Sequence, residues 1–448
     1  MNSQIIHLPF GRQVFPQALF SVLLLSASAI LLFISFYFSN LLAPFQNKFS
    51  VPSSSTLSTL LLLPNTSSSS SSSSSSFVSS SLSSFPFSTS SSSSSSSTST
   101  SDKKCNISKG EWIRDPKEPY YSNITCWMIQ EHQNCMKYGR PDMEFLNWRW
   151  KPDGCELPAF EPVRFLELVR GKSLAFVGDS LARNHMQSLM CLLSRVEYPK
   201  DISNTSDENF KHMFYTNYNF TISIFWSPFL IKARETNPQS SSRVNYMWNL
   251  YLDEVDTNWA NQIDEFDYLI ISAGNWFTRP SLFYEKGHLI GCNYCDQYNN
   301  VTQLTLHYSH REAFKTAFHA INKLKKFKGI IFLRTLSPSH FENGEWNKGG
   351  NCVRQRPFQR NETTFEGFEL EFYKAQIEEF KVAKEEGRKK GLEFRLLDTT
   401  EAMVLRPDGH PSRYGHWAQE NVTLYNDCVH WCLPGPVDVW NSFLLYNL

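Results

Sequence analysis

A short stretch of the chain, residues 173–193, constrains its fold more than any other. Residues 174–177 are an apolar run of the kind that forms a buried strand, and Gly178 interrupts it. Just beyond this glycine, apolar side chains begin to recur at helical spacing. The pattern predicts a strand, a tight glycine turn and a helix, a geometry that lifts the side chain of Ser180 above the edge of a sheet. Backbone N–H groups at the start of such a helix can also hold an oxyanion.

Asp427 and His430, near the C-terminus, are three residues apart. At that spacing the carboxylate can bind one imidazole N–H and fix the tautomer of the ring. The other ring nitrogen is then free to accept a proton from a serine. The alternative for the first stretch is that Asp179 or Ser180 only caps its helix. The order Ser, Asp, His, without a Gly-x-Ser-x-Gly motif at Ser180, differs from that of α/β-hydrolases and matches the GDSL/SGNH layout.

The chain after residue 172 alternates between apolar strands and helices. This order predicts an α/β fold with a parallel sheet and helices on both of its faces. Together with the Ser, Asp, His order, it resembles the SGNH/GDSL type. Active sites in such sheets lie at the carboxyl ends of the strands, which is where Gly178, Asp179 and Ser180 fall. The other predicted strands are 220–226, 267–273, 329–336 and 392–397, and the other predicted helices are 309–326, 364–390 and 437–446.

The first hundred residues are not typical of a folded domain. Residues 18–38 are mostly apolar and long enough to span a bilayer, so we predict a transmembrane signal anchor after a cytosolic tail, residues 1–17. Ala27-Ser-Ala29 resembles a cleavage signal, but the apolar run continues beyond it, which favours a retained anchor. Residues 39–104 are rich in serine and predict a disordered stalk. One large domain follows, residues 105–448.

Charge and cysteine usage bear on the compartment and the partners. The chain carries 43 basic and 43 acidic side chains, so its net charge of zero gives no reason to expect a nucleic-acid partner. All 10 cysteines follow the stalk, which favours disulfides in an oxidising lumen and hence a type II membrane protein. Zinc is the alternative for Cys292 with Cys295, and for Cys428 and Cys432 with His430. N-glycosylation sequons agree with the lumen; they lie at Asn65, Asn106, Asn123, Asn204, Asn219, Asn300, Asn361 and Asn421.

Several blocks of the sequence are similar to the plant trichome birefringence-like family, whose members are Golgi polysaccharide O-acetyltransferases with an SGNH-type core. The blocks are Cys126-Trp127, Phe145-Leu-Asn-Trp-Arg-Trp150, Phe176-Val-Gly-Asp-Ser-Leu-Ala-Arg-Asn184 and Asp427-Cys-Val-His-Trp-Cys-Leu-Pro-Gly435. The resemblance implies an irregular Cys- and Trp-rich segment at 105–161, an SGNH-like catalytic core at 162–448 and a Golgi membrane location. Arg183-Asn-His-Met186 and His340-Phe-Glu-Asn-Gly-Glu-Trp346 are most similar to the members that act on xyloglucan, with mannan-acting members close by.

The resemblance also implies roles for individual residues. Gly178 and Asp179 belong to the nucleophile turn, and Arg183 and Asn184 aid the oxyanion or hold the Ser180 loop. Asn275 follows a predicted strand and can donate its amide to the oxyanion, as the corresponding residue of SGNH enzymes does. The alternatives are a helix-surface position for Asn184 and a simple turn for Asn275. The implied disulfides are Cys105–Cys155, Cys126–Cys191, Cys135–Cys432 and Cys352–Cys428, which leaves Cys292 and Cys295 as a local pair.

Three further histidines are weaker candidates for a role in the site. His185 is expected on another face of the helix than Ser180 and is the less favoured base. His410 and His416 lie in a Gly/Pro-rich loop without the carboxylate or cysteine pattern of a metal site, so we predict no metal there. That loop recurs in the family ahead of the Asp–His block and is expected to form a wall of the active-site cleft.

The predicted function is an acyl transfer in which Ser180 becomes acetylated and the acetyl group then passes to a hydroxyl of a hemicellulose. The resemblance names xyloglucan as the first candidate acceptor and mannan as the second. No cofactor is expected to stay bound. The acetyl donor is a co-substrate, either acetyl-CoA or an acetylated intermediate, and another Golgi membrane protein is a candidate to deliver it. Two alternatives stay open. One is a secretory-pathway carbohydrate acetylesterase with the same triad, since exclusion of water and sugar positioning separate the two reactions. The other is a non-catalytic polysaccharide-binding wall protein.

Overall fold

The computed structural model describes residues 105–117, 119–236, 247–422 and 425–448. The cytosolic tail, the membrane anchor and the Ser-rich stalk predicted from the sequence lie outside the described residues. Among the helices of these described ranges, none is long and apolar enough to cross a membrane.

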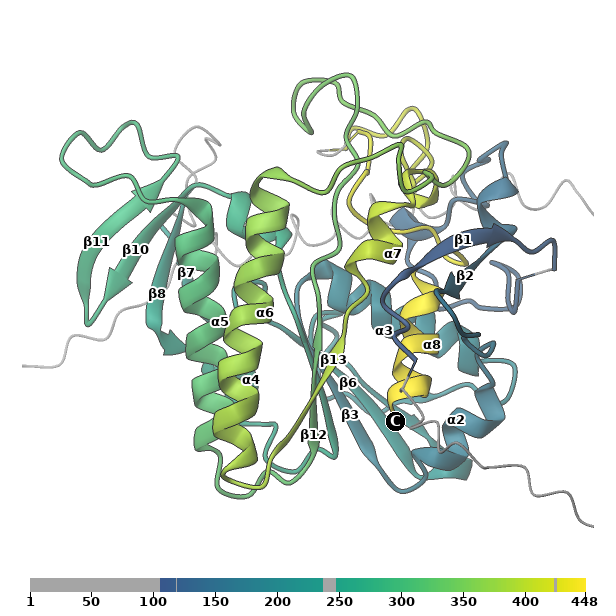
Figure 1. Cartoon of the computed structure of the whole chain (residues 1–448), viewed down its shortest axis with the longest axis horizontal. Helices are drawn as coiled ribbons and strands as arrows, with labels where there is room; N and C mark the ends of the chain where they lie inside the picture. Colours follow the sequence, from purple (N-terminus) through teal and green to yellow (C-terminus); the bar gives the residue numbers. More distant parts are fainter. Residues whose placement is uncertain (1–104, 118, 237–246, 423–424) are drawn as a thin grey trace, which may run out of the picture. The chain divides into compact units, whose positions relative to one another are not determined.

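A seven-stranded sheet forms the centre of the domain (Figure 1). The first five strands in its order run parallel, and the last two pairings are antiparallel. The α/β prediction is therefore confirmed, because parallel neighbours need crossover connections that pass over the faces of the sheet. The order across the sheet is β13 (Glu393–Leu397), β12 (Ile330–Arg334), β9 (Tyr268–Ser272), β3 (Ser173–Gly178), β6 (Phe220–Trp226), β5 (His212–Tyr215) and β4 (Lys200–Asp201).

Helices cover both faces of this sheet, as the sequence predicts (Figure 1). The side chains of β3 are apolar on both faces of the sheet, so both faces must be shielded from water. Leu174 and Phe176 are buried in one apolar cluster, and Ala175 and Val177 are buried in the other. Burying a large apolar side chain stabilises the fold by about 1.5–3 kcal/mol. On the first face lie α3 (Ser180–Leu193) and α8 (Asp438–Asn447), and on the second lie α5 (Leu306–Lys323) and α6 (Gly367–Arg388).

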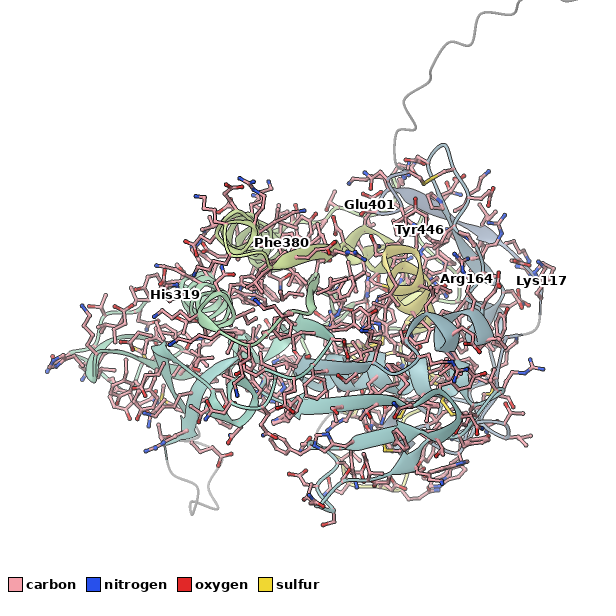
Figure 2. The ribbon with its side chains drawn as sticks, turned by 90° about the horizontal axis from the view of Figure 1, so that it is seen from below. Lys117, Arg164, His319, Phe380, Glu401 and Tyr446 are labelled. Carbon is pink, nitrogen blue, oxygen red and sulfur yellow. A yellow bond between two sulfur atoms is a disulfide. The ribbon has the colours of Figure 1, made fainter. Side chains whose placement is uncertain are left out.

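Aromatic side chains hold the second pair of helices to the sheet. The view from below shows α5 and α6 next to each other, with Phe380 labelled on α6 (Figure 2). The ring of Phe380 lies 6.3 Å from that of Phe318 on α5 and 6.0 Å from that of Phe394 on β13. Edge-to-face pairs at such separations add about 0.5–1.5 kcal/mol beyond the burial of area.

A second sheet of four strands lies beside α5 (Figure 1), and the sequence pattern does not predict it. It is built from two insertions, one after β6 and one after β9. The hydroxyl of Thr316 on α5 donates to the carbonyl of Leu252 at 2.5 Å, which holds the helix against this sheet. The strand order is β11 (His288–Asn293), β10 (Ser281–Glu285), β8 (Trp248–Val255) and β7 (Ile231–Glu235), and α4 (Thr257–Ala260) follows β8.

The described part of the segment 105–161 is irregular, as predicted. Its one strand pair, β1 (Gly110–Arg114) with β2 (Trp148–Pro152), is antiparallel. The indole N–H of Trp112 donates to the carbonyl of Ala402 at 2.7 Å and so ties β1 to the core. The remaining short elements are η2 (Glu131–Gln133), η3 (Glu144–Leu146), α2 (Pro162–Leu168), η4 (Thr216–Tyr218), η6 (Asn275–Thr278), α7 (Thr400–Val404) and η7 (Pro407–Gly409).

All 10 cysteines are paired in the structure, and the pairing implied by the family resemblance is confirmed. The zinc alternatives are therefore wrong, because a cysteine in a disulfide has no thiolate to offer a metal. Both bridges near the C-terminus connect the Asp427–His430 loop to distant parts of the chain. The pairs are Cys105–Cys155, Cys126–Cys191, Cys135–Cys432, Cys292–Cys295 and Cys352–Cys428.

Candidate active site

The turn between β3 and α3 has the predicted form. Asp179 is the N-cap of α3, and its Oδ1 accepts the backbone N–H of Leu181 at 3.0 Å. Gly178 has φ +156°, and a Cβ at this position would lie 1.7 Å from the carbonyl oxygen of Ser272 on β9. Only glycine allows the strands to approach so closely here. As a result Ser180, the first residue of α3, lies at the carboxyl end of a central strand.

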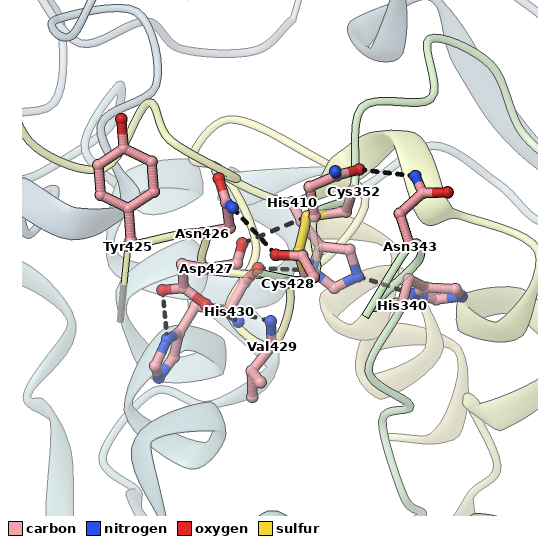
Figure 3. Close-up of a disulfide and its surroundings, with 12 residues drawn as sticks. His340, Asn343, Cys352, His410, Tyr425, Asn426, Asp427, Cys428, Val429 and His430 are labelled. Carbon is pink, nitrogen blue, oxygen red and sulfur yellow. Dashed lines mark hydrogen bonds and ion pairs between the residues drawn. A yellow bond between two sulfur atoms is a disulfide. The ribbon is translucent and has the colours of Figure 1, made fainter. Parts of the chain in front are cut away.

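The structure brings Ser180, His430 and Asp427 into one chain of hydrogen bonds. His430 Nε2 lies 2.7 Å from Ser180 Oγ, and His430 Nδ1 lies 2.7 Å from Asp427 Oδ2 (the latter contact is drawn in Figure 3). The second carboxylate oxygen, Oδ1, accepts the backbone N–H groups of Val429 at 3.1 Å and His430 at 2.9 Å. With Nδ1–H donated to Asp427, Nε2 is left as the acceptor for the serine hydroxyl.

Charge in the site favours a basic histidine. Burial opposes ionisation of Asp427, but the charge and hydrogen bonds of His430 outweigh it and lower the pKa of the carboxyl. Burial likewise opposes the imidazolium of His430, but the Asp427 carboxylate outweighs it and raises the pKa of the ring. The side chain of His430 is still 17% exposed, so a substrate can reach it. This arrangement can take a proton from Ser180 and stabilise the resulting imidazolium.

Asn184 supports the histidine loop. Its Oδ1 accepts the backbone N–H of Trp431 at 2.9 Å, and its Nδ2 donates to the carbonyl of the same residue at 3.4 Å. Asn184 is fully buried, so the alternative of a helix-surface position is wrong. Its amide group binds the backbone of Trp431, the neighbour of His430, and does not bind the Ser180 loop. The indole N–H of Trp431 adds a third contact, to Ser337 Oγ at 2.9 Å.

Asn275 lies close to the nucleophile turn. It begins η6 directly after β9, and the preceding residue, Gly274, donates its N–H to Asp179 Oδ2 at 3.2 Å. Among the described residues, the buried Nδ2 of Asn275 has no hydrogen-bond partner. The oxyanion role of Asn275 stays a prediction. Arg183 is oriented differently: its guanidinium donates to Asn209 Oδ1.

The other histidines are placed as follows. His185 is fully buried between the rings of Phe176 and Trp440, at 5.1 Å and 5.3 Å, and has no contact with Ser180. His410 is also buried, and its Nδ1 is 2.7 Å from the carbonyl of His430. That its loop forms a wall of the active-site cleft stays a prediction. His416 contacts the backbone carbonyls of Trp417 and Tyr425, at 2.9 Å and 3.1 Å.

His132 is a residue of the site that the sequence analysis missed. It comes from η2, and its ring centroid lies 4.9 Å from that of His430 at an interplanar angle of 75°. Burial first, and then the neighbouring charge of His430, lowers the pKa of His132 to about 3, so this ring is neutral near pH 7. The signal that points to it is the Cys135–Cys432 disulfide, since both cysteines lie within three residues of the two histidines.

The sequon asparagines of the described ranges are accessible to a glycosyltransferase. Asn123 is half-buried, and Asn106, Asn204, Asn219, Asn300, Asn361 and Asn421 are exposed. Their glycosylation stays a prediction. Asn65 lies outside the described residues.

The fold and the site define an SGNH-like α/β protein with a serine, a histidine and an aspartate in hydrogen-bond contact. Comparison with protein-family models agrees. Residues 157–447 match the GDSL/SGNH-like acyl-esterase family found in Pmr5 and Cas1p, and residues 103–156 match the PMR5 N-terminal domain. The chain therefore belongs to the trichome birefringence-like family of polysaccharide O-acetyltransferases, and it is an acyltransferase of that family.

Individual relatives support the same assignment. Protein trichome birefringence-like 19 of Arabidopsis thaliana is 57% identical over 350 residues, which cover 78% of this chain and 82% of the relative. Xyloglucan O-acetyltransferase 4 of Populus trichocarpa is 44% identical over 345 residues, 77% of this chain and 81% of the relative. Xyloglucan O-acetyltransferase 2 of Arabidopsis thaliana is 41% identical over 346 residues, 77% of this chain and 82% of the relative.

Proposed function

We propose that this chain transfers an acetyl group through Ser180 to a hydroxyl of a hemicellulose, with xyloglucan as the first candidate acceptor and mannan as the second. The observation that carries the proposal is the hydrogen-bond chain from Ser180 Oγ through His430 to Asp427, with 2.7 Å at each contact of the ring. A serine hydroxyl in such a chain is a nucleophile, because the imidazole removes its proton as it attacks.

The reaction has two balanced halves. In the first, Ser180 Oγ attacks the acetyl carbonyl and its proton passes to His430 Nε2. The tetrahedral oxyanion would be stabilised by the amide of Asn275 and by the backbone N–H of Ser180, at the start of α3. Collapse of this intermediate breaks the bond to the donor, and the leaving group takes the proton from His430. In the second half a sugar hydroxyl attacks acetyl–Ser180, His430 takes the hydroxyl proton, and the same proton returns to Ser180 as the sugar ester is released.

An aromatic surface beside the triad suits a sugar acceptor. Trp226 lies level with Gly178 across the β6–β3 pairing, and its ring is 5.4 Å from that of Trp276, which follows β9. Both indoles are partly exposed. The guanidinium of Arg183 lies 5.2 Å from the Trp226 ring and that of Arg279 lies 3.9 Å from the Trp276 ring. Indole faces can stack on the apolar faces of sugar rings, and two relatives are named as xyloglucan O-acetyltransferases.

The proposed location is the Golgi membrane, with a single type II anchor at residues 18–38 and the catalytic domain in the lumen. The apolar run of the anchor, the five disulfides and the accessible sequons support it. The acetyl donor acts as a co-substrate, acetyl-CoA or an acetylated intermediate, and a second Golgi membrane protein is a candidate to deliver it.

Hydrolysis of sugar acetates is the second candidate function. The family description names acyl-esterases, and water can serve in place of the sugar in the second half-reaction. The two functions share acetyl–Ser180 and differ only in what attacks it.

The test uses the full chain, produced in a secretory host so that its disulfides form. It is incubated with acetyl-CoA or an acetylated ester donor and with xyloglucan or mannan oligosaccharides, and acetylated sugars are measured by mass spectrometry. We expect sugar acetylation by the wild type and none by Ser180→Ala or His430→Ala. Loss of acetyl from pre-acetylated sugars, without transfer, supports the esterase instead. A Ser180→Ala variant with full transfer overturns the assignment of the nucleophile.

A further inference from the structure

Two histidines outside the triad form a chain behind His430. Figure 3 shows His410 between His340 and the backbone of His430. His410 Nδ1 lies 2.7 Å from the carbonyl oxygen of His430, and His410 Nε2 lies 2.7 Å from His340 Nδ1. His340 Nε2, at the far end, lies 3.0 Å from the carbonyl oxygen of Val404. The four ring nitrogens of the two histidines therefore take part in three contacts. The chain ends at a carbonyl oxygen on each side, and a carbonyl oxygen can only accept a hydrogen bond.

The number of protons decides which of these contacts are hydrogen bonds. Burial lowers the pKa of His340 to about 4 and lowers the pKa of His410 well below its ordinary value, so near pH 7 both rings are neutral. Two neutral imidazoles carry two N–H groups, one each. Two protons can complete only two of the three contacts, and the third must place two lone pairs against each other.

The longest of the three contacts is the candidate for the one that lacks a proton. Repulsion between lone pairs is smallest where the atoms are furthest apart, and the contact of His340 with Val404 is the longest of the three. If that contact has no proton, each of the two rings carries its proton on its own Nδ1. His340 then donates to His410 Nε2, and His410 donates to the carbonyl of His430. A backbone carbonyl is a common partner for the Nδ1–H of a histidine.

This bond completes the restraint on the peptide of His430. The backbone N–H of His430 donates to Asp427 Oδ1 at 2.9 Å, and the next N–H, that of Trp431, donates to Asn184. The carbonyl between them is the acceptor for His410. The ring of His410 also stacks on that of Trp431, with centroids 4.0 Å apart and an interplanar angle of 25°. The backbone that carries the catalytic base is thus held at each polar atom.

We propose that His410 is a positioning residue for His430, with its Nδ1–H donated to the His430 carbonyl, and that His340 holds His410 in this tautomer by donating its own Nδ1–H to His410 Nε2. The proposal rests on the proposed function only in that His430 is taken as the base. It follows the logic by which an outer partner selects the tautomer of a functional histidine.

Several charged groups surround the pair and are part of its environment. Arg140, from the N-terminal segment, donates to the carbonyl of His410 at 2.8 Å. Arg406 is paired with Asp408 at 2.7 Å next to the loop. Burial has the largest effect and lowers the pKa of both rings, while the charge of Glu342 acts to raise the pKa of His340 and that of Asp427 acts to raise the pKa of His410. His430, on the far side of the contact, becomes positive during the reaction, which disfavours a second positive charge on His410.

Three substitutions at one position test the proposal. His410→Asn keeps an N–H donor near the place of Nδ1, His410→Gln moves the amide to the place of Nε2, and His410→Phe keeps only the ring that stacks on Trp431. We expect kcat to fall by about tenfold to a hundredfold in the Gln and Phe variants, since a displacement of about 1 Å can cost that much, while KM stays unchanged. The Asn variant should recover most of the loss. A purely structural role predicts instead that Phe, which keeps the stacking, is the best of the three, and that result overturns the proposal.

A second measurement does not depend on activity. The full chain is labelled with ¹⁵N-histidine, and the resonances of His410 and His340 are assigned by their loss in His410→Asn and His340→Gln. We expect both rings as the Nδ1–H tautomer near pH 7. An Nε2–H tautomer at His410 refutes the proposal whether or not the protein transfers acetyl. If the tautomers are as expected and the wild type has no transferase or esterase activity, the proposed function fails and the positioning contact stands.

Discussion

Replacing Asn184 with alanine tests how firmly the loop of the catalytic base must be held. The side chain satisfies two backbone groups of the buried Trp431, through contacts of 2.9 Å and 3.4 Å. Leaving a buried polar group unpaired costs about 1–3 kcal/mol, and the longer contact belongs at the low end of that range. Asn184→Ala should therefore lose about 2–4 kcal/mol of stability, which a domain of ordinary stability survives. Since Trp431 is adjacent to His430, the rate of acetyl transfer should fall as well.

The control for this variant is Asn322→Ala. Asn322 is also buried, and its Nδ2 donates to a backbone carbonyl, that of Ala383, at 3.1 Å. It lies on α5, on the other face of the sheet from Asn184. Both variants should lower the midpoint of thermal unfolding by several degrees. Only Asn184→Ala should lower kcat beyond what the folded fraction explains. Equal losses of kcat in the two variants would refute the reasoning.

Three further predictions concern the turn, the charge and the bridge of the site. Gly178→Ala should not yield folded protein, because its Cβ would lie 1.7 Å from the carbonyl oxygen of Ser272; normal secretion would contradict this. Burial lowers the pKa of His430, but the charge and hydrogen bond of Asp427 together outweigh burial, so the pKa is raised. Only the neutral ring can accept a proton from Ser180. The acid limb of kcat/KM should thus lie above the ordinary histidine pKa of about 6.5 and shift to lower pH in Asp427→Asn, alongside a large drop in kcat. Removing the Cys352–Cys428 bridge, which spans 76 residues, should cost about 4 kcal/mol, measured by thermal unfolding against the unreduced wild type.

The sequence predicts those parts of the fold that local patterns encode. The apolar runs of β3, β6, β9, β12 and β13 and the spacing of α5, α6 and α8 are each contained in one stretch, and all are confirmed. The four-stranded sheet is missed because its pairings are non-local. β8 pairs in parallel with β10, although β9, which lies between them in the sequence, belongs to the seven-stranded sheet. The short strand β7 alternates weakly and has no signal of its own.

The candidate site divides in the same way. Ser180, Asp427 and His430 stand in recognisable motifs, and their contact is seen in the structure. The supporting residues carry no such pattern. Asn184 could be expected at the site, but its partner is Trp431, 247 residues away. His132 and the pair His340 and His410 meet the loop of His430 only through tertiary packing, and a lone histidine in an irregular segment has no local signal.

The most direct test of the central claim is the acetylated enzyme itself. The full chain is mixed with the acetyl donor without a sugar acceptor, quenched in acid, digested, and examined by mass spectrometry for the peptide that contains Ser180. The account predicts an acetyl group on Ser180 that disappears when a xyloglucan oligosaccharide is added and that does not form in His430→Ala. Transfer of acetyl to sugar by a wild-type protein in which Ser180 is never acetylated would contradict it.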